Sequence, residues 1–330
     1  MKLIHAATEL QPGDRKVCLA IGFFDGVHLG HQQIIRQTLA DARQHSALAL
    51  VLTFDQHPNT IVAPNRVPPL IYSRSQRIRA LESLGTEALL LIHFDRAFSA
   101  QTGEEFVRNL VRDLGSGGGR HSGPQPVRGG EDAAGRSPVL QSICVGANFA
   151  FGHKRSGNVP LLKRLGEELH FTVHGLAAVS LDGRVVSSTR IREAIRDGDL
   201  DAAGQMLGRT YSLAARVIQG DKLGHKIGFP TANLDGTGLV LPPNGVYAAH
   251  AAARGETHRA VLNIGYRPTL ENRLPQLRVE VHLLDFTGDL YGEEIEITFA
   301  EELRKEKKFP SLAALREQIA LDIAEAKRRF

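Results

Sequence analysis

Short apolar runs alternate with amphipathic stretches between Val17 and about Ala178. The runs are VCLAIG, ALALVLTF, ALLLIHF, SICVG and FTVHGLAAV, and each has the length and apolar character of a buried strand. Residues 31–46 and 102–114 place apolar side chains at helical spacing, and Gly115 follows the second stretch as a helix stop. Strands that alternate with helices are typical of a parallel sheet, so the pattern predicts a doubly wound α/β domain.

After Tyr211 the chain changes to short alternating stretches broken by Gly and Pro. YSLAARVIQG, GVYAAHAAA, HRAVLNIG, LRVEVHLLDF and EIEITFA have the spacing of a small antiparallel β-barrel. A helix predicted over Thr189–Leu200 separates the two textures, so we expect one domain at 1–200 and another at 201–330. A final helix should pack on the barrel through an apolar stripe formed by Leu312, Leu315, Ile319 and Ile323.

Composition narrows the class of protein. The 330 residues are 42% hydrophobic, enough for two cores, and the net charge of +4 is spread along the chain. Nucleic-acid binding would call for a concentrated basic stripe, which the sequence lacks. It also lacks a secretory signal or a membrane-spanning run. Cys18 and Cys144 lie inside apolar runs, so we expect reduced thiols, as in a cytoplasmic protein. Separately, we expect a monomer or a weak homo-oligomer.

Residues 115–138 interrupt the first domain. This stretch holds eight Gly and three Pro among 24 positions and almost no apolar side chains. Such a segment cannot bury enough surface to offset its ordering entropy, so it is predicted to be a disordered surface loop whose excision leaves turnover nearly unchanged. Its glycines do not form a phosphate-binding loop, because no GxxxxGK[ST] occurs in the sequence.

GFFDGVHLGH, residues 22–31, follows the first predicted strand and leads into the first predicted helix. This turn therefore lies at the carboxyl edge of the sheet, where doubly wound folds bind ligands and a helix N-terminus favours anions. Gly26 and Gly30 let the backbone approach a phosphate, and His28 and His31 offer hydrogen-bond donors. From spacing alone three interpretations stay open: phosphate binding, which the position favours, a solvated loop, and a metal site.

The same residues resemble a known family. GFFDGVHLGH is similar to the HxGH signature of nucleotidyltransferases, in the form found in bacterial bifunctional riboflavin kinase/FMN adenylyltransferases. TFDQHP, VGANFAFGHKRSGN and SSTRIR resemble further motifs of that family, in the same order. The resemblance implies a nucleotidyltransferase-like first domain that transfers AMP from ATP to FMN and releases pyrophosphate.

The resemblance also implies residue roles in this domain. His28 and His31 would be catalytic, holding the ATP phosphates and stabilising the departing pyrophosphate. Taken alone, Ser or Thr near a helix start is expected as a cap, and aromatic residues after a strand as core. Nucleotide or flavin contacts are implied for Gly22, Phe23, Phe24, Asp25, Gly30, His57, Asn148, Phe149, Ser188, Thr189, Arg190 and Arg192.

GDKLGHKIGFPTANL, residues 220–234, resembles the riboflavin kinase motif of the same family. Thr231 and Asn233 offer hard oxygen ligands, which suit Mg²⁺ bound together with phosphate oxygens. Apolar and polar residues alternate in LRVEVHLLDF, which places Glu280 on the polar face of its strand. The resemblance implies that Glu280 is the base for the riboflavin 5′-hydroxyl. Taken alone, a glutamate at such a position is more often a surface residue. Further nucleotide or flavin contacts are implied for Gly224, Lys226, Gly228, Pro230 and Asn263.

The resemblance thus implies a bifunctional enzyme that makes FMN from riboflavin and ATP in the second domain, and FAD from FMN and ATP in the first, both with Mg²⁺. Two alternatives remain at this point. One is a nucleotidyltransferase for another acceptor, and the other is a catalytically idle flavin-binding regulator. The stretch RKEKKF follows the kinase pattern too, but on its own indicates only a solvated charge run.

Overall fold

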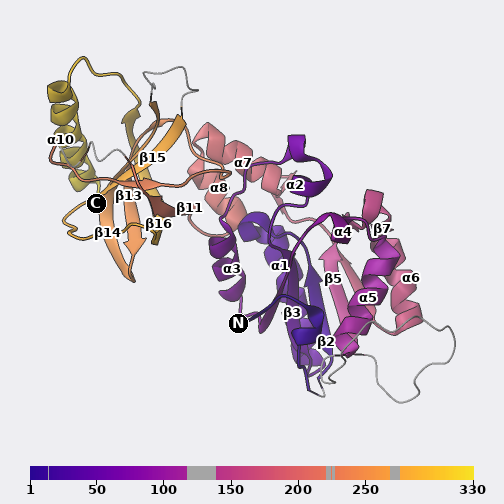
Figure 1. Cartoon of the computed structure of the whole chain (residues 1–330). Coiled ribbons are helices and arrows are strands. Elements are labelled where there is room, and N and C mark those ends of the chain that lie inside the picture. Colours follow the sequence, from indigo (N-terminus) through magenta and orange to yellow (C-terminus); the bar gives the residue numbers. More distant parts are fainter. Residues whose placement is uncertain (14, 117–138, 221–223, 225–226, 268–275) are drawn as a thin grey trace. The chain divides into compact units, whose positions relative to one another are not determined.

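The computed structural model describes residues 1–13, 15–116, 139–220, 224, 227–267 and 276–330 (Figure 1). The chain forms two compact units, each with its own sheet. Met1–Pro68 and Arg77–Val186 make up the first unit, and Pro69–Gln76 and Ser187–Phe330 the second. The predicted disordered loop lies outside the described residues from position 117 onward.

The first unit is built on a six-stranded sheet in the order β1-β4-β3-β2-β5-β8. Every pairing in it is parallel, which confirms the predicted α/β domain. The five predicted strands are present; the edge strand β1 was not predicted, since it has only three residues. The strands are β1 (Lys2–Ile4), β2 (Val17–Ile21), β3 (Leu48–Phe54), β4 (Ala88–Ile92), β5 (Leu140–Gly146) and β8 (Thr172–Leu176).

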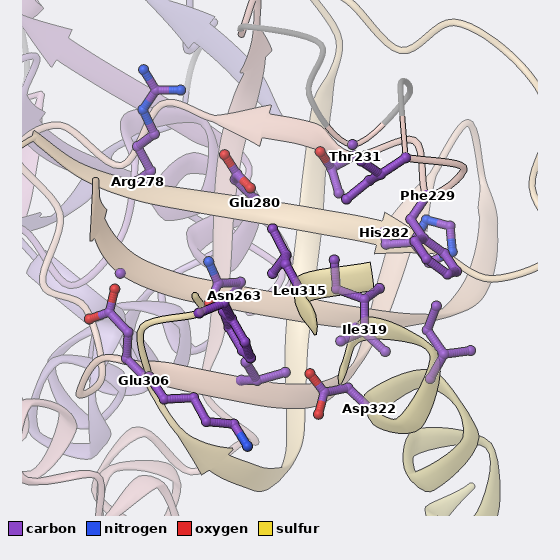
Figure 2. Close-up of a pocket in the computed structure, with 18 of the residues that line it drawn as sticks. Phe229, Thr231, Asn263, Arg278, Glu280, His282, Glu306, Leu315, Ile319 and Asp322 are labelled. Carbon is purple, nitrogen blue, oxygen red and sulfur yellow. The ribbon is translucent and has the colours of Figure 1, made fainter. Parts of the chain in front are cut away.

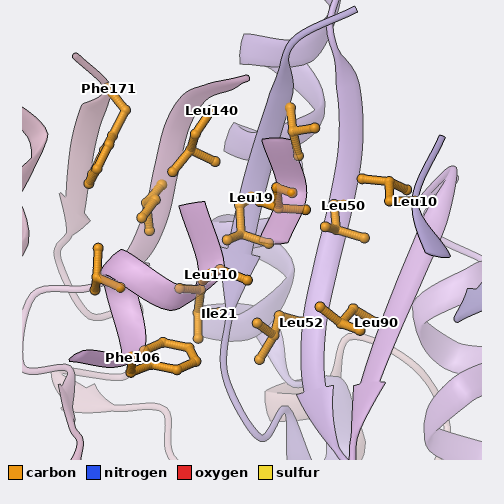
Figure 3. Packing of buried hydrophobic residues seen from close by; sticks show 14 of the residues in the cluster. Leu10, Leu19, Ile21, Leu50, Leu52, Leu90, Phe106, Leu110, Leu140 and Phe171 are labelled. Atoms are coloured by element: carbon orange, nitrogen blue, oxygen red, sulfur yellow. The ribbon is translucent and has the colours of Figure 1, made fainter. Parts of the chain in front are cut away.

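Helices cover both faces of this sheet (Figure 1). On one face, α1 (Leu29–Gln44) packs Ile35 and Leu39 onto the strands, and Leu81 of α3 (Arg74–Glu82) joins them. On the other face, α5 (Gly103–Gly115) and α6 (Val159–Leu169) cover the cluster of Figure 3, where Phe106 and Leu110 meet strand residues. Both faces of the central strands are therefore buried, which explains why those strands are apolar throughout.

Shorter elements connect these layers. They are η1 (Ala7–Glu9), η2 (Asp25–Val27), α2 (Asn59–Val62), η3 (Pro64–Arg66), α4 (Arg96–Ser99), β6 (Ala150–Phe151), η4 (His153–Arg155), β7 (Gly157–Asn158), β9 (Ser180–Leu181) and β10 (Arg184–Val185). None of the helices in the described ranges is long and apolar enough to cross a bilayer.

The second unit contains a closed barrel in the order β11-β12-β15-β14-β13-β16. All its pairings are antiparallel, as predicted. The strand β12 was missed, because three residues are too few to show an alternating pattern. The strands are β11 (Ser212–Ile218), β12 (Ala232–Leu234), β13 (Gly245–Ala253), β14 (Glu256–Arg267), β15 (Gln276–Leu283) and β16 (Glu294–Lys305).

Two helices precede the barrel where the sequence predicts one. The helix α7 (Ser188–Asp197) ends at Gly198, which takes a left-handed conformation with φ of 82°. A second helix, α8 (Leu200–Leu207), then begins after Asp199, whose side chain caps it. The predicted single helix to Leu200 is therefore wrong, since a glycine in this conformation ends a helix.

The helix α10 (Leu312–Arg329) packs on the barrel, as predicted. Its Ala326 is fully buried in a cluster with Val246, Ala248 and Val261 of the barrel strands. The predicted apolar stripe is wrong at its first position, because Leu312 is 58% exposed. The first residue of the helix is thus not part of the packed face.

Candidate active sites

The histidine turn lies between β2 and α1, at the carboxyl edge of the parallel sheet. His28 is the N-cap of α1, and its Nδ1 accepts a hydrogen bond of 3.4 Å from the backbone N–H of His31. The two imidazole rings are stacked, with centroids 3.6 Å apart. Gly30 leaves room for the ring of His28, because a Cβ at that position would make a tight contact of 3.3 Å with its Cε1.

Both histidine rings are largely removed from water. His28 is 7% exposed, and His31 Nδ1 is a buried atom without a hydrogen-bond partner in the described part of the chain. Burial lowers the pKa of His31 well below its ordinary value of 6.5, and the neighbouring His28 and the charge of Arg77 lower it further. His31 is therefore a neutral imidazole at neutral pH, which can donate a hydrogen bond but carries no full charge.

Aromatic rings connect the turn to its surroundings. Phe24 is buried and meets the ring of His31 edge-on, with centroids 5.3 Å apart. Phe23 meets the ring of His57 in the same way at 4.8 Å. Since His57 follows β3 and Phe23 follows β2, the structure brings these predicted residues together at one edge of the sheet. Gly22 and Asp25 complete the turn, and Asp25 is buried.

The other residues predicted for this site lie in two places, in the turn after β5 and in α7; β5 pairs in parallel with β2, so its turn lies at the same carboxyl edge of the sheet as the histidine turn. Asn148 is exposed in the turn after β5, whereas Phe149 stacks on Phe151 at 5.2 Å and packs against the sheet core, so these aromatics are core-packed as their type alone suggests. The positions in α7 belong to the second unit. The cap of that helix is Ser187, one residue before the predicted Ser188, Thr189, Arg190 and Arg192.

The second unit holds a cavity of about 340 Å³ (Figure 2). Polar residues of the barrel strands line one side of it, and apolar residues of α10 line another. Glu280 and Asn263 lie on adjacent strands in register, and Asn233 is in register with Glu280 on the other neighbouring strand. These three polar residues therefore form a row across β12, β15 and β14 that faces the cavity.

Thr231 lines the same cavity, and two glycines allow close approach of the chain to the predicted metal ligands. A Cβ at Gly224 would lie 2.4 Å from the carbonyl oxygen of Phe229 and 2.9 Å from Oγ1 of Thr231. A Cβ at Gly220 would lie 2.2 Å from Nδ2 of Asn233. The backbone at Gly220 and Gly224 therefore packs more closely around Thr231 and Asn233 than a residue with a Cβ would allow, and we call it the glycine cradle.

Of the other residues predicted in the loop at 220–234, the structure describes Pro230 and Gly228. The carbonyl oxygen of Pro230 accepts a hydrogen bond of 2.7 Å from Nδ1 of His282, which ties the loop to β15. Gly228 has a φ of 89°, a conformation that suits glycine. Lys226 lies outside the described residues.

Sequence reasoning missed a large part of the cavity lining. The charge run RKEKKF supplies cavity residues instead of forming a merely solvated face, and the stripe of α10 forms an apolar wall. The helical spacing of that stripe is visible in the sequence, but the sequence does not show which surface the stripe faces. The missed lining residues include Phe229, Tyr266, Arg278, His282, Arg304, Glu306, Lys307, Phe309, Leu315, Ile319, Asp322 and Ile323.

Comparisons with known proteins match both units. The riboflavin kinase family matches residues 207–330, and the FAD synthetase family matches residues 10–116 and 137–190. The bifunctional riboflavin kinase/FMN adenylyltransferase of Haemophilus influenzae is 35% identical, over 99% of this chain and 97% of its own. The chain belongs to the bifunctional riboflavin kinase/FMN adenylyltransferase family.

Other members of this family are similar over the full chain. The Escherichia coli K12 enzyme of the same name is 34% identical, over 100% of this chain and 98% of its own, and the Bacillus subtilis enzyme is 32% identical. A solved structure described as a macrolide-efflux protein from Streptococcus pneumoniae matches with a TM-score of 0.75 and 26% identity, over 98% of both chains. The burial of His28 and of Nδ1 of His31 argues against the interpretation of the histidine turn as a mere solvated loop.

No cluster of three or more His, Cys, Asp or Glu side chains in the described ranges is arranged to hold a metal ion. Within those ranges, His28 and His31 therefore lack the further ligands that a structural or catalytic zinc ion needs. The donor set at Thr231 and Asn233 is of another kind, a hydroxyl and an amide oxygen, and its fit to a metal ion depends on phosphate oxygens.

Proposed function

We propose that this chain carries out two successive reactions of flavin metabolism, the two for which its family relatives are named. The second unit phosphorylates riboflavin with ATP to give FMN, and the first transfers AMP from ATP to FMN to give FAD. We propose that the sequence boundary between the two functional domains lies between residues 200 and 201. The observation that carries this proposal is the row of Asn233, Glu280 and Asn263 beside Thr231 in one cavity, in the same chain as the stacked histidine pair.

In the kinase cavity, Glu280 is the proposed base. Its carboxylate accepts the proton of the riboflavin 5′-hydroxyl while that oxygen attacks the γ-phosphorus of ATP, and ADP leaves. The apolar wall of Leu315, Ile319 and Ile323 suits the flat ring system of the flavin, and it excludes water from the reacting hydroxyl. Glu280 lies opposite this wall in Figure 2.

Thr231 and Asn233 fit the Mg²⁺ that accompanies ATP. Mg²⁺ prefers oxygen ligands and keeps phosphate oxygens and water in its shell, so two protein oxygens inside a glycine cradle suffice. When bound there, Mg²⁺ neutralises charge on the ATP phosphates. Thr231 and Asn233 orient that complex toward Glu280, and the loop's tie between Pro230 and His282 fixes their position on the barrel.

In the first unit, a phosphate oxygen of FMN attacks the α-phosphorus of ATP, and the bond to the pyrophosphate oxygen breaks. Nδ1 of His28 accepts a hydrogen bond from the backbone N–H of His31. The ring proton of His28 therefore sits on Nε2, from which it can be donated to a phosphate oxygen. His31 donates as a neutral imidazole. Both donors act beside the N-terminus of α1, whose free N–H groups favour the negative charge that develops on pyrophosphate.

Two single variants test this assignment. We expect His28→Ala to reduce FAD formation from supplied FMN by about 10²-fold or more, and to leave FMN formation intact. Glu280→Gln should reduce FMN formation by about 10²-fold or more and leave FAD formation intact. Each reaction is followed by chromatography of the flavin products, and each variant serves as the other's control. If both folded variants lost both activities, the assignment of separate sites would be wrong.

The same readout separates this proposal from its alternatives. A transferase for another acceptor would make no FAD from FMN, and an idle flavin-binding regulator would make neither product. We further propose a cytoplasmic location, since Cys18 and Cys144 are free and buried. A monomer or a weak homo-oligomer remains our proposal for the state in solution.

A further inference from the structure

Arg77 is a charged side chain placed inside the first unit. It is 2% exposed and lies on α3, outside every motif that resembles the family. Its Nη1 donates to the carbonyl oxygen of Phe23 at 3.0 Å, and its Nη2 donates to the carbonyl oxygen of Phe54 at 2.6 Å. Burial of a cation costs free energy, so a buried arginine that binds backbone oxygens calls for a physical reason.

The two carbonyls mark where the sheet ends and the histidine turn begins. Phe54 is the last residue of β3, and Phe23 is the second residue after β2. The carbonyl oxygen of Phe23 also accepts a hydrogen bond of 2.9 Å from Oγ1 of Thr53. One main-chain oxygen at the entrance of the turn is therefore held by two side chains, and Arg77 joins it to the neighbouring strand.

The turn that starts there has an unfavourable backbone. Phe24 has a φ of 56° and Val27 a φ of 43°, a region that residues with a Cβ rarely occupy. Such a conformation is strained and persists only where the surroundings enforce it. Phe24 and Val27 are both buried, and they set the path of the chain into His28. The anchoring of Phe23 is therefore a condition for the path of the turn.

Arg77 also reaches the rings of the site. Its guanidinium lies over the ring of Phe23, 4.2 Å from the centroid, and the edge of that ring meets His57. The charge of Arg77 contributes to the lowered pKa of His31, after burial and the neighbouring His28. The same side chain thus acts on the backbone of the turn, on one aromatic neighbour and on the electrostatic state of one histidine.

We propose that Arg77 is a positioning residue for adenylyl transfer: it fixes the main chain at Phe23 so that His28 and His31 meet the ATP phosphates. The inference rests on the proposed function of the first unit. Arg77 acts through the turn, because its Nη1 and Nη2 donate to the two backbone carbonyls. Loss of the side chain therefore affects the transition state more than substrate binding, and it lowers kcat with little change in KM for FMN.

The test compares Arg77→Met and Arg77→Lys with Arg79→Met, an exposed arginine on the same helix. We expect Arg77→Met to lower kcat of FAD formation by about 10²-fold, the effect of a displacement near 1 Å. Arg77→Lys should recover much of this loss, since an ammonium group can donate to the same carbonyls. Arg79→Met should keep full activity, and FMN formation should stay at the wild-type level in all three variants.

Thr53→Val is a second variant that keeps the shape of the side chain and removes the other donor to Phe23. We expect it to lower kcat of FAD formation in the same direction by a smaller factor. The inference is overturned if Arg77→Met and Thr53→Val both keep FAD formation within about 3-fold of wild type, which is below the effect of misplaced catalytic groups. It is also overturned if FMN formation and the melting temperature fall in parallel with FAD formation, because the role is then general stability. Failure of wild-type protein to make FAD would refute the proposed function instead.

Discussion

Two ion pairs join α10 to β16, and they differ in burial. Arg304 and Asp322 have side chains that are 18% and 7% exposed, and they are joined by contacts of 2.7 to 3.1 Å. Arg329 and Glu301 form the second pair at 2.9 Å, with side chains that are 47% and 49% exposed. We predict that Asp322→Ala is strongly destabilising, whereas Arg329→Ala has little effect.

The magnitude follows from what each change leaves behind. Asp322→Ala leaves Arg304 largely buried without its carboxylate, and it removes the acceptor of Gln318. Breaking a buried pair in this way costs about 3–5 kcal/mol, and the residual exposure of Arg304 favours the lower end, about 3 kcal/mol. For a unit of roughly 150 residues, this corresponds to a fall in melting temperature of roughly 6–12 °C. The exposed pair is already solvated, so its loss changes little.

Intrinsic tyrosine fluorescence gives a signal that is specific to the second unit. The chain has five Tyr and no Trp. All five tyrosines lie in the second unit, at Tyr72, Tyr211, Tyr247, Tyr266 and Tyr291. Urea and thermal unfolding followed by this signal therefore report the stability of the barrel and its helix in the intact protein.

The same variant tests the link between stability and the kinase cavity. Because Arg304 and Asp322 line that cavity beside Ile319, we expect Asp322→Ala to raise KM for riboflavin and to leave FAD formation from supplied FMN unchanged. Asp322→Asn, which keeps one oxygen acceptor, should fall between wild type and Asp322→Ala. An Asp322→Ala protein as stable as Arg329→Ala would refute the reasoning, since burial would then make no difference.

Three further outcomes are expected. Gly224→Ala places a Cβ 2.4 Å from the carbonyl oxygen of Phe229, so FMN formation should fall sharply while FAD formation is kept, as product chromatography would show. Burial raises the pKa of Cys144 to about 12, so a maleimide at neutral pH should label native protein slowly and both thiols after unfolding. The hydrogen bond to Asp55 raises the pKa of His93 above 6.5. Burial by itself would raise the pKa of Asp55, but the hydrogen bonds from His93 and from the backbone of Phe94 lower the pKa of Asp55 below 3.8. This pair therefore stabilises the fold fully between about pH 4 and 6.5, and its contribution is lost below the lowered pKa and above the raised one. Urea midpoints by circular dichroism should show the largest effect of His93→Ala in that window and none at high pH.

The two sheets could be predicted because their strands carry strong local patterns. The central strands of the first unit are apolar on both faces, and β15 alternates, which also places Glu280 on the polar side of its strand. Short elements such as β1 and β12 escape this reasoning, since three residues cannot display a period. The predicted end of a helix was wrong where a single residue in a left-handed conformation ends that helix, as Gly198 does.

The histidine turn could be predicted because its parts are contiguous in sequence. A strand end, three glycines, two histidines and a helix start follow one another within residues 17–44, so their proximity follows from chain connectivity. The kinase cavity is different, because it is assembled from β12, β13, β14, β15, β16 and α10. Its charged segment RKEKKF has no periodic signal that separates cavity lining from a solvated face.

Arg77 shows most clearly what sequence patterns leave out. It stands in RSQRIR, where three arginines at neighbouring positions look alike, yet Arg77 is 2% exposed and Arg74 and Arg79 are exposed. Its partners Phe23 and Phe54 are 54 and 23 residues away, so only the assembled sheet brings the carbonyls within reach of the guanidinium. The backbone strain at Phe24 is also invisible in the sequence, because it depends on φ. A motif can therefore indicate candidate groups for substrate contact, whereas side chains that bind the backbone of the motif from distant parts of the chain, as Arg77 does, have to be found in the structure.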